Sequence, residues 1–170
     1  RCLAANIPTP EVYAVLDPAR PKAPTIPSLQ SVEELLRFIE EKEITEFVMK
    51  PVHGTKGQAV RLLHFDPTTG LRSADGTDVS RSDLEALTQY AYRGVEQNSF
   101  LIQERVYPHA STQQLNANCP VSYRVITLLD QVGNPHKVHV YVKLPGGESL
   151  TDNLAAGGLA CPVDENGICV

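Results

Sequence analysis

The stretch from Phe47 to Val60 constrains the fold of this chain more than any other part of the sequence. It reads FVMKPVHGTKGQAV, so an apolar run ends in a lysine, a loop with two glycines and another lysine follows, and a second apolar run returns. Glycines let backbone N–H groups turn toward an anion, and lysines add positive charge at the end of a buried strand. The stretch predicts a β-hairpin whose loop holds a phosphate. The alternative is a plain hairpin turn that binds no ligand. The presence of Lys50 and Lys56 favours the phosphate-binding loop.

This loop differs from the most familiar nucleotide-binding motifs. The patterns GxxxxGKS, GxxxxGKT and GxGxxG are absent from the sequence, and no helix is predicted directly after the glycines. A kinase-type site would also require His-Arg-Asp and Asp-Phe-Gly elements, which the sequence lacks. The loop therefore has to be interpreted together with the rest of the chain.

The remaining sequence predicts an α+β fold with helices beside antiparallel sheets. Ser31 and Glu34 form a capping-box pattern that predicts a helix over residues 32–42, and Ser80 or Ser82 is expected to begin a helix that ends near residue 93. Apolar and β-branched runs bounded by turn residues predict the strands. The predicted strands cover residues 11–16, 44–50, 59–65, 71–72, 99–106, 122–129 and 137–144.

Composition excludes several classes of protein. Lys and Arg number 15 against 20 Asp and Glu, and a net charge of −5 argues against neutralising the phosphates of duplex nucleic acid. No apolar run approaches the roughly 20 residues of a membrane-spanning helix, so no membrane partner is expected. The four cysteines form no CxxC pair, which predicts reduced thiols and a cytoplasmic location.

Several elements, taken in chain order, resemble the ATP-grasp superfamily. They are Lys50-Pro51, the loop Gly54-Thr-Lys-Gly57, the run FLIQERV over residues 100–106, Tyr123-Arg124-Val125, and Asp152-Asn153 followed by Gly157-Gly158. Their order resembles that of ligases of the ribosomal-protein glutamate ligase type. The combination of Arg124-Val-Ile-Thr127 with Asp152-Asn153 and the Gly-Gly pair is most similar to the sugar-transfer-associated branch.

The resemblance implies a two-lobed ATP-grasp-like fold that is truncated at its C-terminus. Residues 1–30 would form an opening segment, residues 31–102 the small lobe with the glycine loop, and residues 103–170 the first part of the large lobe. Because the first residue is Arg1 and the last elements of the family follow Val170, the chain is expected to be a fragment of a longer protein.

The resemblance also implies how ATP is bound. Lys50 would contact the α- and β-phosphates, and the glycine loop with Lys56 would close over the β- and γ-phosphates. His53 would add a donor at the entrance of the loop, and backbone groups of residues 103–106 would read the adenine edge. The implied nucleotide-binding residues are Lys50, His53, Gly54, Thr55, Lys56, Gly57, Gln103, Glu104, Arg105 and Val106.

Three further residues are implied to serve the chemical step. Arg124 would face the transferred phosphate or the acceptor carboxylate, Lys143 would replace an arginine of relatives, and Asn153 would lie near the acyl phosphate. The carboxylate with which relatives bind the ribose is absent from Tyr107-Pro-His-Ala110, where His109 is the candidate substitute.

A magnesium ion is implied as the partner of ATP, with its main ligands expected beyond Val170. Asp164-Glu-Asn-Gly167 offers acids but is predicted to be a solvated hairpin turn, so no metal ligand is assigned on this chain. His136 and His139, three apart on a predicted strand, should face opposite sides, which argues against a shared metal. We expect the chain alone to have little ligase activity and to associate with itself to cover its exposed sheet.

The leading hypothesis is ATP-dependent activation of a small carboxylate. An acyl phosphate would form and then react with an amine or a thiol, and the family's neighbourhood suggests sugar or cell-surface polymer biosynthesis. The alternative is a non-catalytic module that kept the ATP-grasp fold for nucleotide sensing or for interaction. Lost ATP binding in a Lys50 variant would favour the first hypothesis, and no binding at millimolar ATP would favour the second.

Overall fold

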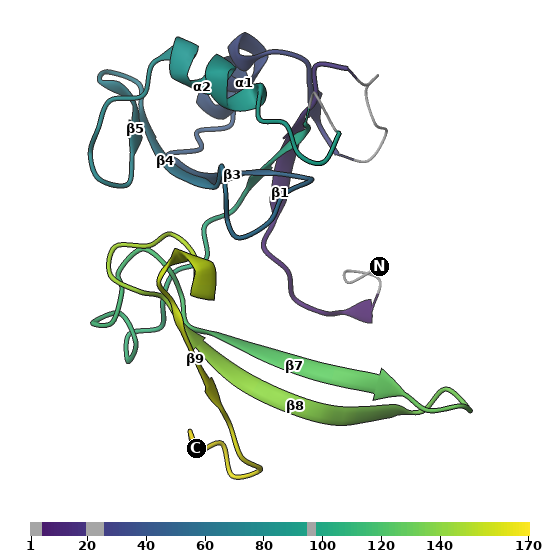
Figure 1. Cartoon of the computed structure of the whole chain (residues 1–170). Coiled ribbons are helices and arrows are strands. Elements are labelled where there is room, and N and C mark those ends of the chain that lie inside the picture. Colours follow the sequence, from purple (N-terminus) through teal and green to yellow (C-terminus); the bar gives the residue numbers. More distant parts are fainter. Residues whose placement is uncertain (1–4, 20–25, 95–97) are drawn as a thin grey trace. The chain divides into compact units, whose positions relative to one another are not determined.

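The chain consists of two compact units, Arg1–Arg105 (unit 1) and Val106–Val170 (unit 2). The computed structural model describes residues 5–19, 26–94 and 98–170 (Figure 1). Each unit has its own sheet, so the expected α+β class with antiparallel-rich sheets is confirmed. Among the described residues, no helix is long and apolar enough to span a bilayer.

Unit 1 is built on a sheet with the strand order β2-β1-β6-β3-β4-β5. The parallel pair is β1 with β2, and the other neighbouring strands pair antiparallel. The strands are β1 (Val12–Leu16), β2 (Ser28–Leu29), β3 (Glu46–Pro51), β4 (Arg61–Asp66), β5 (Gly70–Ser73) and β6 (Phe100–Gln103). The predicted hairpin around the glycine loop is therefore confirmed as β3–loop–β4, at the centre of the sheet.

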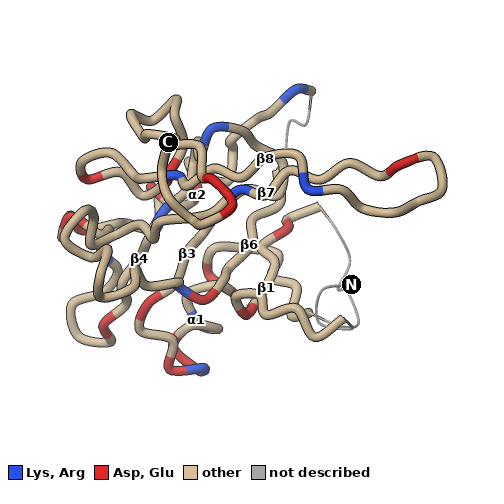
Figure 2. Tube along the Cα trace, turned by 90° about the horizontal axis from the view of Figure 1, so that it is seen from below, with Lys and Arg blue, Asp and Glu red and all other residues tan. Residues whose placement is uncertain are grey.

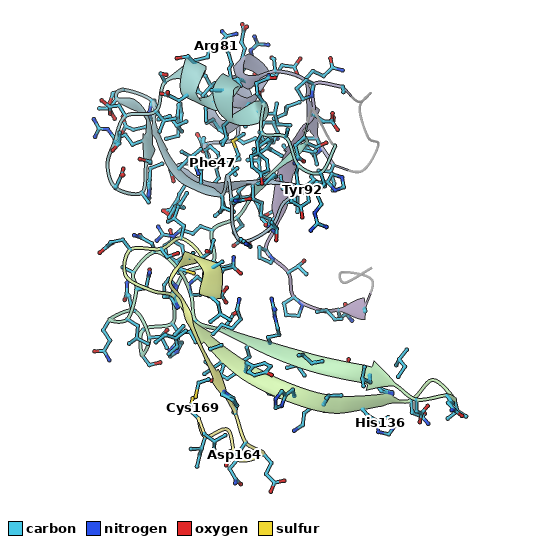
Figure 3. All side chains as sticks on the ribbon, viewed as in Figure 1. Phe47, Arg81, Tyr92, His136, Asp164 and Cys169 are labelled. Carbon is cyan, nitrogen blue, oxygen red and sulfur yellow. The ribbon has the colours of Figure 1, made fainter. Side chains whose placement is uncertain are left out.

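Two helices, α1 (Val32–Glu41) and α2 (Arg81–Thr88), cover one face of this sheet (Figure 1). Strand register places Phe47 beside Leu63 and Met49 beside Ile102 on that face, because directly opposed residues share a side. Figure 3 shows Phe47 between the sheet and the helices. The largest fully buried side chains are Phe47, Phe100, Leu16, Leu35, Ile39, Met49, Leu63, Leu84, Ile102 and Asn98.

The helix ends follow the predicted caps with two differences. Ser31 Oγ accepts a hydrogen bond from Glu34 N at 3.1 Å, but the Glu34 carboxylate accepts from Gln30 N at 2.8 Å instead of closing a reciprocal box. For α2, Ser80 is the cap, and the box is completed by Asp83. This second helix ends at Thr88, well before the predicted residue 93.

The early end of α2 has a local cause. Thr88 Oγ1 donates to Glu85 O at 2.7 Å, and Gln89 N bonds to Ala86 O with the tighter spacing of a helix end. Further on, Arg93 has a φ of 48°, in the left-handed region, which a right-handed helix cannot contain.

Unit 2 is a three-stranded sheet in the order β7-β8-β9. Its strands are β7 (Ser122–Leu129), β8 (Pro135–Leu144) and β9 (Leu159–Pro162), with a short 3₁₀ helix, η2 (Leu154–Ala156), before β9. The predicted turn at the end of the chain is present, since Asp164 N bonds to Ile168 O and Val163 pairs with Cys169. Asp164 Oδ1 accepts from Asn166 N and Ile168 N, so this carboxylate is used inside the turn.

A bulge in β8 corrects the prediction for the two histidines. The register passes from Ile126 opposite His139 to Thr127 opposite Lys137, so Val138 has no directly opposed residue. His136 then pairs with Leu128 and lies on the same face as His139, where a regular strand would separate them.

Candidate functional site

Lys50 projects from the face of the unit 1 sheet that lies opposite the helices. It alternates with the buried Met49 along β3 and stands directly opposite Leu101 of β6. On the same face, Val48 is flanked by Leu62 of β4 and Gln103 of β6. Burial lowers the pKa of Lys50 below its ordinary value, because the charged ammonium loses water there. This face combines the partly desolvated Lys50 ammonium with the apolar side chains of Val48 and Leu62, and the Glu46–Arg105 ion pair lies further along it.

The loop after Lys50 is held in unusual backbone conformations. Lys56, Gly57 and Ala59 all have φ in the left-handed region, at 58°, 73° and 58°. Glycine adopts this region freely, whereas each non-glycine residue costs about 1 kcal/mol or more. Backbone strain of this kind concentrates in loops that bind ligands, which supports the phosphate interpretation over a plain turn.

Short hydrogen-bonded turns organise the loop internally. Gln58 N donates to Thr55 O at 3.1 Å, and Val60 N donates to Gly57 O at 3.3 Å. The side chains of residues 53–56 are exposed. Lys56 therefore has its ammonium in solvent, where it is available to an anion.

The predicted adenine-reading segment is partly occupied by contacts within unit 1. Glu104 N donates to Glu11 O at 2.8 Å, and the Glu104 carboxylate accepts from Glu11 N at 3.0 Å. Gln103 Nε2 donates to Pro10 O at 3.2 Å. The Arg105 guanidinium is paired with Glu46 and is 11% exposed, so it is held against the sheet. The role proposed for this segment consequently rests on the backbone of residues 105 and 106.

A groove of about 700 Å³ lies on the helix-covered side of unit 1, between α2 and strands β4 and β5. Its wall includes Arg61 and Leu63, which share the helix-covered face with Met49 and Phe47. Lys50 belongs to the opposite face. The groove nevertheless reaches the glycine loop, because Ala59 of that loop and Tyr90, which bonds to Gln58, are part of its lining.

In unit 2, the predicted catalytic Lys143 lies in a buried ion pair. Its Nζ donates to Asp152 Oδ1 at 2.6 Å, and Ser122 Oγ donates to the other oxygen of the same carboxylate. The Lys143 and Asp152 side chains are only 10% and 17% exposed. The ion pair holds the start of the loop at residue 152. It also neutralises the charge of Lys143 within unit 2.

Arg124 lies on the same face as Lys143 but is exposed. The pairs Ser122–Lys143 and Arg124–Tyr141 place these four side chains on one side of the β7–β8 hairpin. The other side carries Tyr123 and apolar residues of both strands. Figure 2 marks basic positions on β7 and β8 and an acidic one near the tip of the hairpin.

Asn153 begins the 3₁₀ turn η2 and is half-buried. Its backbone carbonyl accepts from Ala156 N at 2.9 Å and from Gly158 N at 3.0 Å. A Cβ on Gly158 would meet the backbone oxygens of Asp152 and Asn153 at 2.9 Å, so only glycine fits this close approach. The Asp-Asn and Gly-Gly elements of the sequence thus meet in one tight turn.

Sequence reasoning assigned no role to several polar residues that shape these sites. Asn116 is 6% exposed, donates to Gly147 O and Ser149 O at 2.6 and 2.9 Å, and accepts from the backbone of residues 118 and 119. Asn98 is 1% exposed and bonds to His53 at the start of the glycine loop. Both contacts span more than 30 residues, so no local pattern in the sequence signals them.

The structure gives little support for chemistry at Cys119. Burial raises the pKa of its thiol to about 11, and the Asp152 carboxylate adds to this effect. A thiol with that pKa stays protonated at neutral pH, and the thiolate is the nucleophile of cysteine enzymes.

The described residues contain no group of three or more His, Cys, Asp or Glu side chains that could hold a metal ion. Asp152 is committed to Lys143 and Ser122, and Asp164 is committed to its turn. These donors therefore do not fit a magnesium site.

Comparison with known protein families gives a match over the whole chain. The sequence model of the family described as sugar-transfer associated ATP-grasp matches residues 1–170. No curated protein and no solved structure matches the chain significantly.

Proposed function

The chain belongs to the sugar-transfer associated ATP-grasp family, and from that premise we propose that it binds ATP and serves ATP-dependent activation of a small carboxylate. An oxygen of the carboxylate would attack the γ-phosphorus of ATP, and ADP would leave. An amine or thiol would then attack the carbonyl carbon of the acyl phosphate, and inorganic phosphate would leave. The link to sugar or cell-surface polymer biosynthesis and the cytoplasmic location are further parts of this proposal.

The observation that carries the proposal is the placement of Lys50. Its ammonium is a partly desolvated cation on the face of the unit 1 sheet opposite the helices, and the glycine loop begins at Gly54, four residues later. An anion bound there would replace the lost hydration of the ammonium and restore its ordinary pKa. Phosphoryl transfer relies chiefly on positioning and on cations that offset the developing charge.

The other predicted site residues have binding or positioning roles in this proposal. Lys56 adds a solvated charge from the loop, and Arg124 offers an exposed guanidinium for a phosphate or carboxylate. Asn153 supplies a carboxamide at a tightly built turn. Lys143 acts through Asp152 by holding that turn and is a positioning residue.

Lys50→Met is expected to weaken ATP binding at least about tenfold. Methionine keeps most of the length of the unbranched side chain opposite Leu101 but removes the charge. Isothermal titration with ATP measures the change. Lys42→Met is the matched control, because Lys42 is exposed at the end of α1 and its loss should leave affinity within about twofold.

Two results would count against the role of this lysine or the binding itself. Equal affinities for Lys50→Met and the unchanged chain would remove the proposed role of Lys50. Absence of binding by the unchanged chain at millimolar ATP would favour the alternative, a non-catalytic interaction module with the same fold.

We also propose that the chain pairs with a second copy through β7, which is one of the two edge strands of the unit 2 sheet. Antiparallel pairing of two β7 strands about Thr127 would place Val125 opposite Leu129 and Arg124 opposite Asp130. Val125 and Leu129 are 56% and 72% exposed in the single chain. The apolar surfaces are therefore complementary, as an unprotected edge strand requires for pairing, whereas the Asp130 carboxylate is already engaged by its own turn and by His136.

Sedimentation velocity is expected to show a dimer whose fraction rises with concentration. Val125→Lys, which places a charge in the paired strand, should shift the population to monomer. Val132→Lys is the control, since Val132 is 81% exposed in the hairpin turn, outside the paired strand. A monomer at every concentration tested would contradict the pairing.

A further inference from the structure

Asn98 makes the two backbone hydrogen bonds that a strand residue would make. Its Oδ1 accepts from His53 N at 3.0 Å, and its Nδ2 donates to His53 O. The side chain is 1% exposed and lies just before β6. A carboxamide carries one acceptor and one donor group side by side, so it can pair with a peptide in this way.

This contact extends the β3–β6 ladder beyond the end of the strands. Pro51 is opposite Phe100, Val52 N then donates to Ser99 O at 2.7 Å, and the Asn98 carboxamide takes the next rung on His53. The backbone is therefore fixed through residue 53. Gly54 is the first residue after the last rung, where the loop leaves the ladder.

The far end of the loop is held from the same connection. Tyr90 Oη donates to Gln58 Oε1 at 3.1 Å, and both Tyr90 and Asn98 lie between α2 and β6. A Cβ on Gly54 would be 3.1 Å from Pro51 Cγ and 3.9 Å from a ring carbon of Tyr90. The loop thus spans two anchors, at His53 and Gln58, with Lys56 and Gly57 between them.

We propose that Asn98 is a positioning residue that clamps His53 and sets Gly54 as the hinge of the glycine loop, so that Lys50 and Lys56 can act on one polyphosphate. The functional part of this inference rests on the proposed ATP binding. The clamp itself does not, because it is a property of the chain without nucleotide. The two parts can be tested separately.

The first measurement is amide hydrogen exchange of the chain without nucleotide. In Asn98→Ala, the His53 amide should exchange at least about tenfold faster, together with the loop after it. Amides in the centre of β3 and β4 should keep their protection. Asn134→Ala is the matched control, since Asn134 bonds to Asp130 in the hairpin turn of unit 2 and should leave the loop unchanged.

The second measurement compares ATP with AMP by titration. Asn98→Ala should lose about tenfold in ATP affinity and keep its AMP affinity, because the loop is proposed to contact the β- and γ-phosphates. General damage to the fold would instead lower the affinities for ATP and AMP by a similar factor. Tyr90→Phe removes the hydrogen bond to Gln58 at the other anchor without making a cavity. It should show the same selective loss of ATP affinity, by a smaller factor.

Each outcome decides one of the two parts. Unchanged exchange at His53 in Asn98→Ala overturns the clamp. Faster exchange with unchanged ATP affinity, or with equal losses for ATP and AMP, overturns the positioning role. If the unchanged chain binds no ATP, the proposed function fails and the positioning role fails with it, while the exchange experiment still decides the clamp. Should Asn98→Ala not fold, Tyr90→Phe decides the positioning role by the same ATP and AMP comparison.

Discussion

Asp152→Ala is expected to destabilise unit 2 by about 3 kcal/mol, the lower end of the range for breaking a buried ion pair. The change would leave the Lys143 ammonium in a site that is 10% exposed, with its partner at 2.6 Å removed, and would leave Ser122 Oγ without its acceptor. The loss of stability is measured by urea unfolding, monitored through the NMR resonances or the hydrogen exchange of the β8 amides.

The double variant Lys143→Met, Asp152→Leu separates pairing from packing. It removes both charges, so the cost of an unpaired buried ion disappears, and its stability should lie within about 1 kcal/mol of the unchanged chain. A double variant as unstable as Asp152→Ala would show that shape, and not charge pairing, holds this loop.

The same pair gives unit 2 a defined dependence on pH. Burial alone would raise the pKa of Asp152 and is the largest single influence, but the hydrogen bonds from Lys143 and Ser122 together with the attraction of the ammonium lower it below 3.8. A carboxylate with a lower pKa in the folded state adds stability that is complete above pH 3.8. That stability should fade as the pH drops from about 3.8 through the folded pKa, and Asp152→Ala should lack this phase.

Gly146→Ala is expected to cost unit 2 about 3 kcal/mol or more. The added Cβ would stand 2.2 Å from the carbonyl oxygen of Gly157 and 2.7 Å from its carbon. These are backbone atoms, so no side-chain rotation can relieve the overlap. The 146–149 and 153–158 loops would have to separate, and the turn that carries Asn153 would move with them.

Gly147→Ala is the matched control for this prediction. Gly147 has a φ of 50°, but a Cβ added there would meet nothing within 4 Å among the described residues, so the substitution should cost only about 1 kcal/mol of backbone strain. Thermal unfolding of the two variants, followed by circular dichroism, makes the comparison. Similar losses for both would contradict the close approach of the two loops.

The local parts of the fold were predictable because neighbouring residues determine them. The cap at Ser31 and the turn at Asp164 depend on contacts within a few residues, and the strands on either side of the glycine loop are neighbours along the chain that pair directly. The end of α2 was predicted too late, since apolar spacing continues to Ala91 although the backbone turns left-handed at Arg93.

The missed features depend on contacts between distant residues. Asn98 reaches across 45 residues to His53, and Asn116 reaches across 31 to Gly147. The bulge at Val138 is set by the pairing with β7, which spacing along β8 cannot reveal. For the candidate site, the sequence indicated which residues carry charge but not that Lys143 is already paired with Asp152.

The alternation of sides along β3 also limits how genes for such chains can change. Deleting or inserting one codon between Glu46 and Lys50 would rotate every following side chain by half a turn, which would bury the ammonium and bring Met49 out to water. We therefore expect homologous genes to tolerate indels in the β4–β5 turn, around Thr68, while this strand evolves by point substitution.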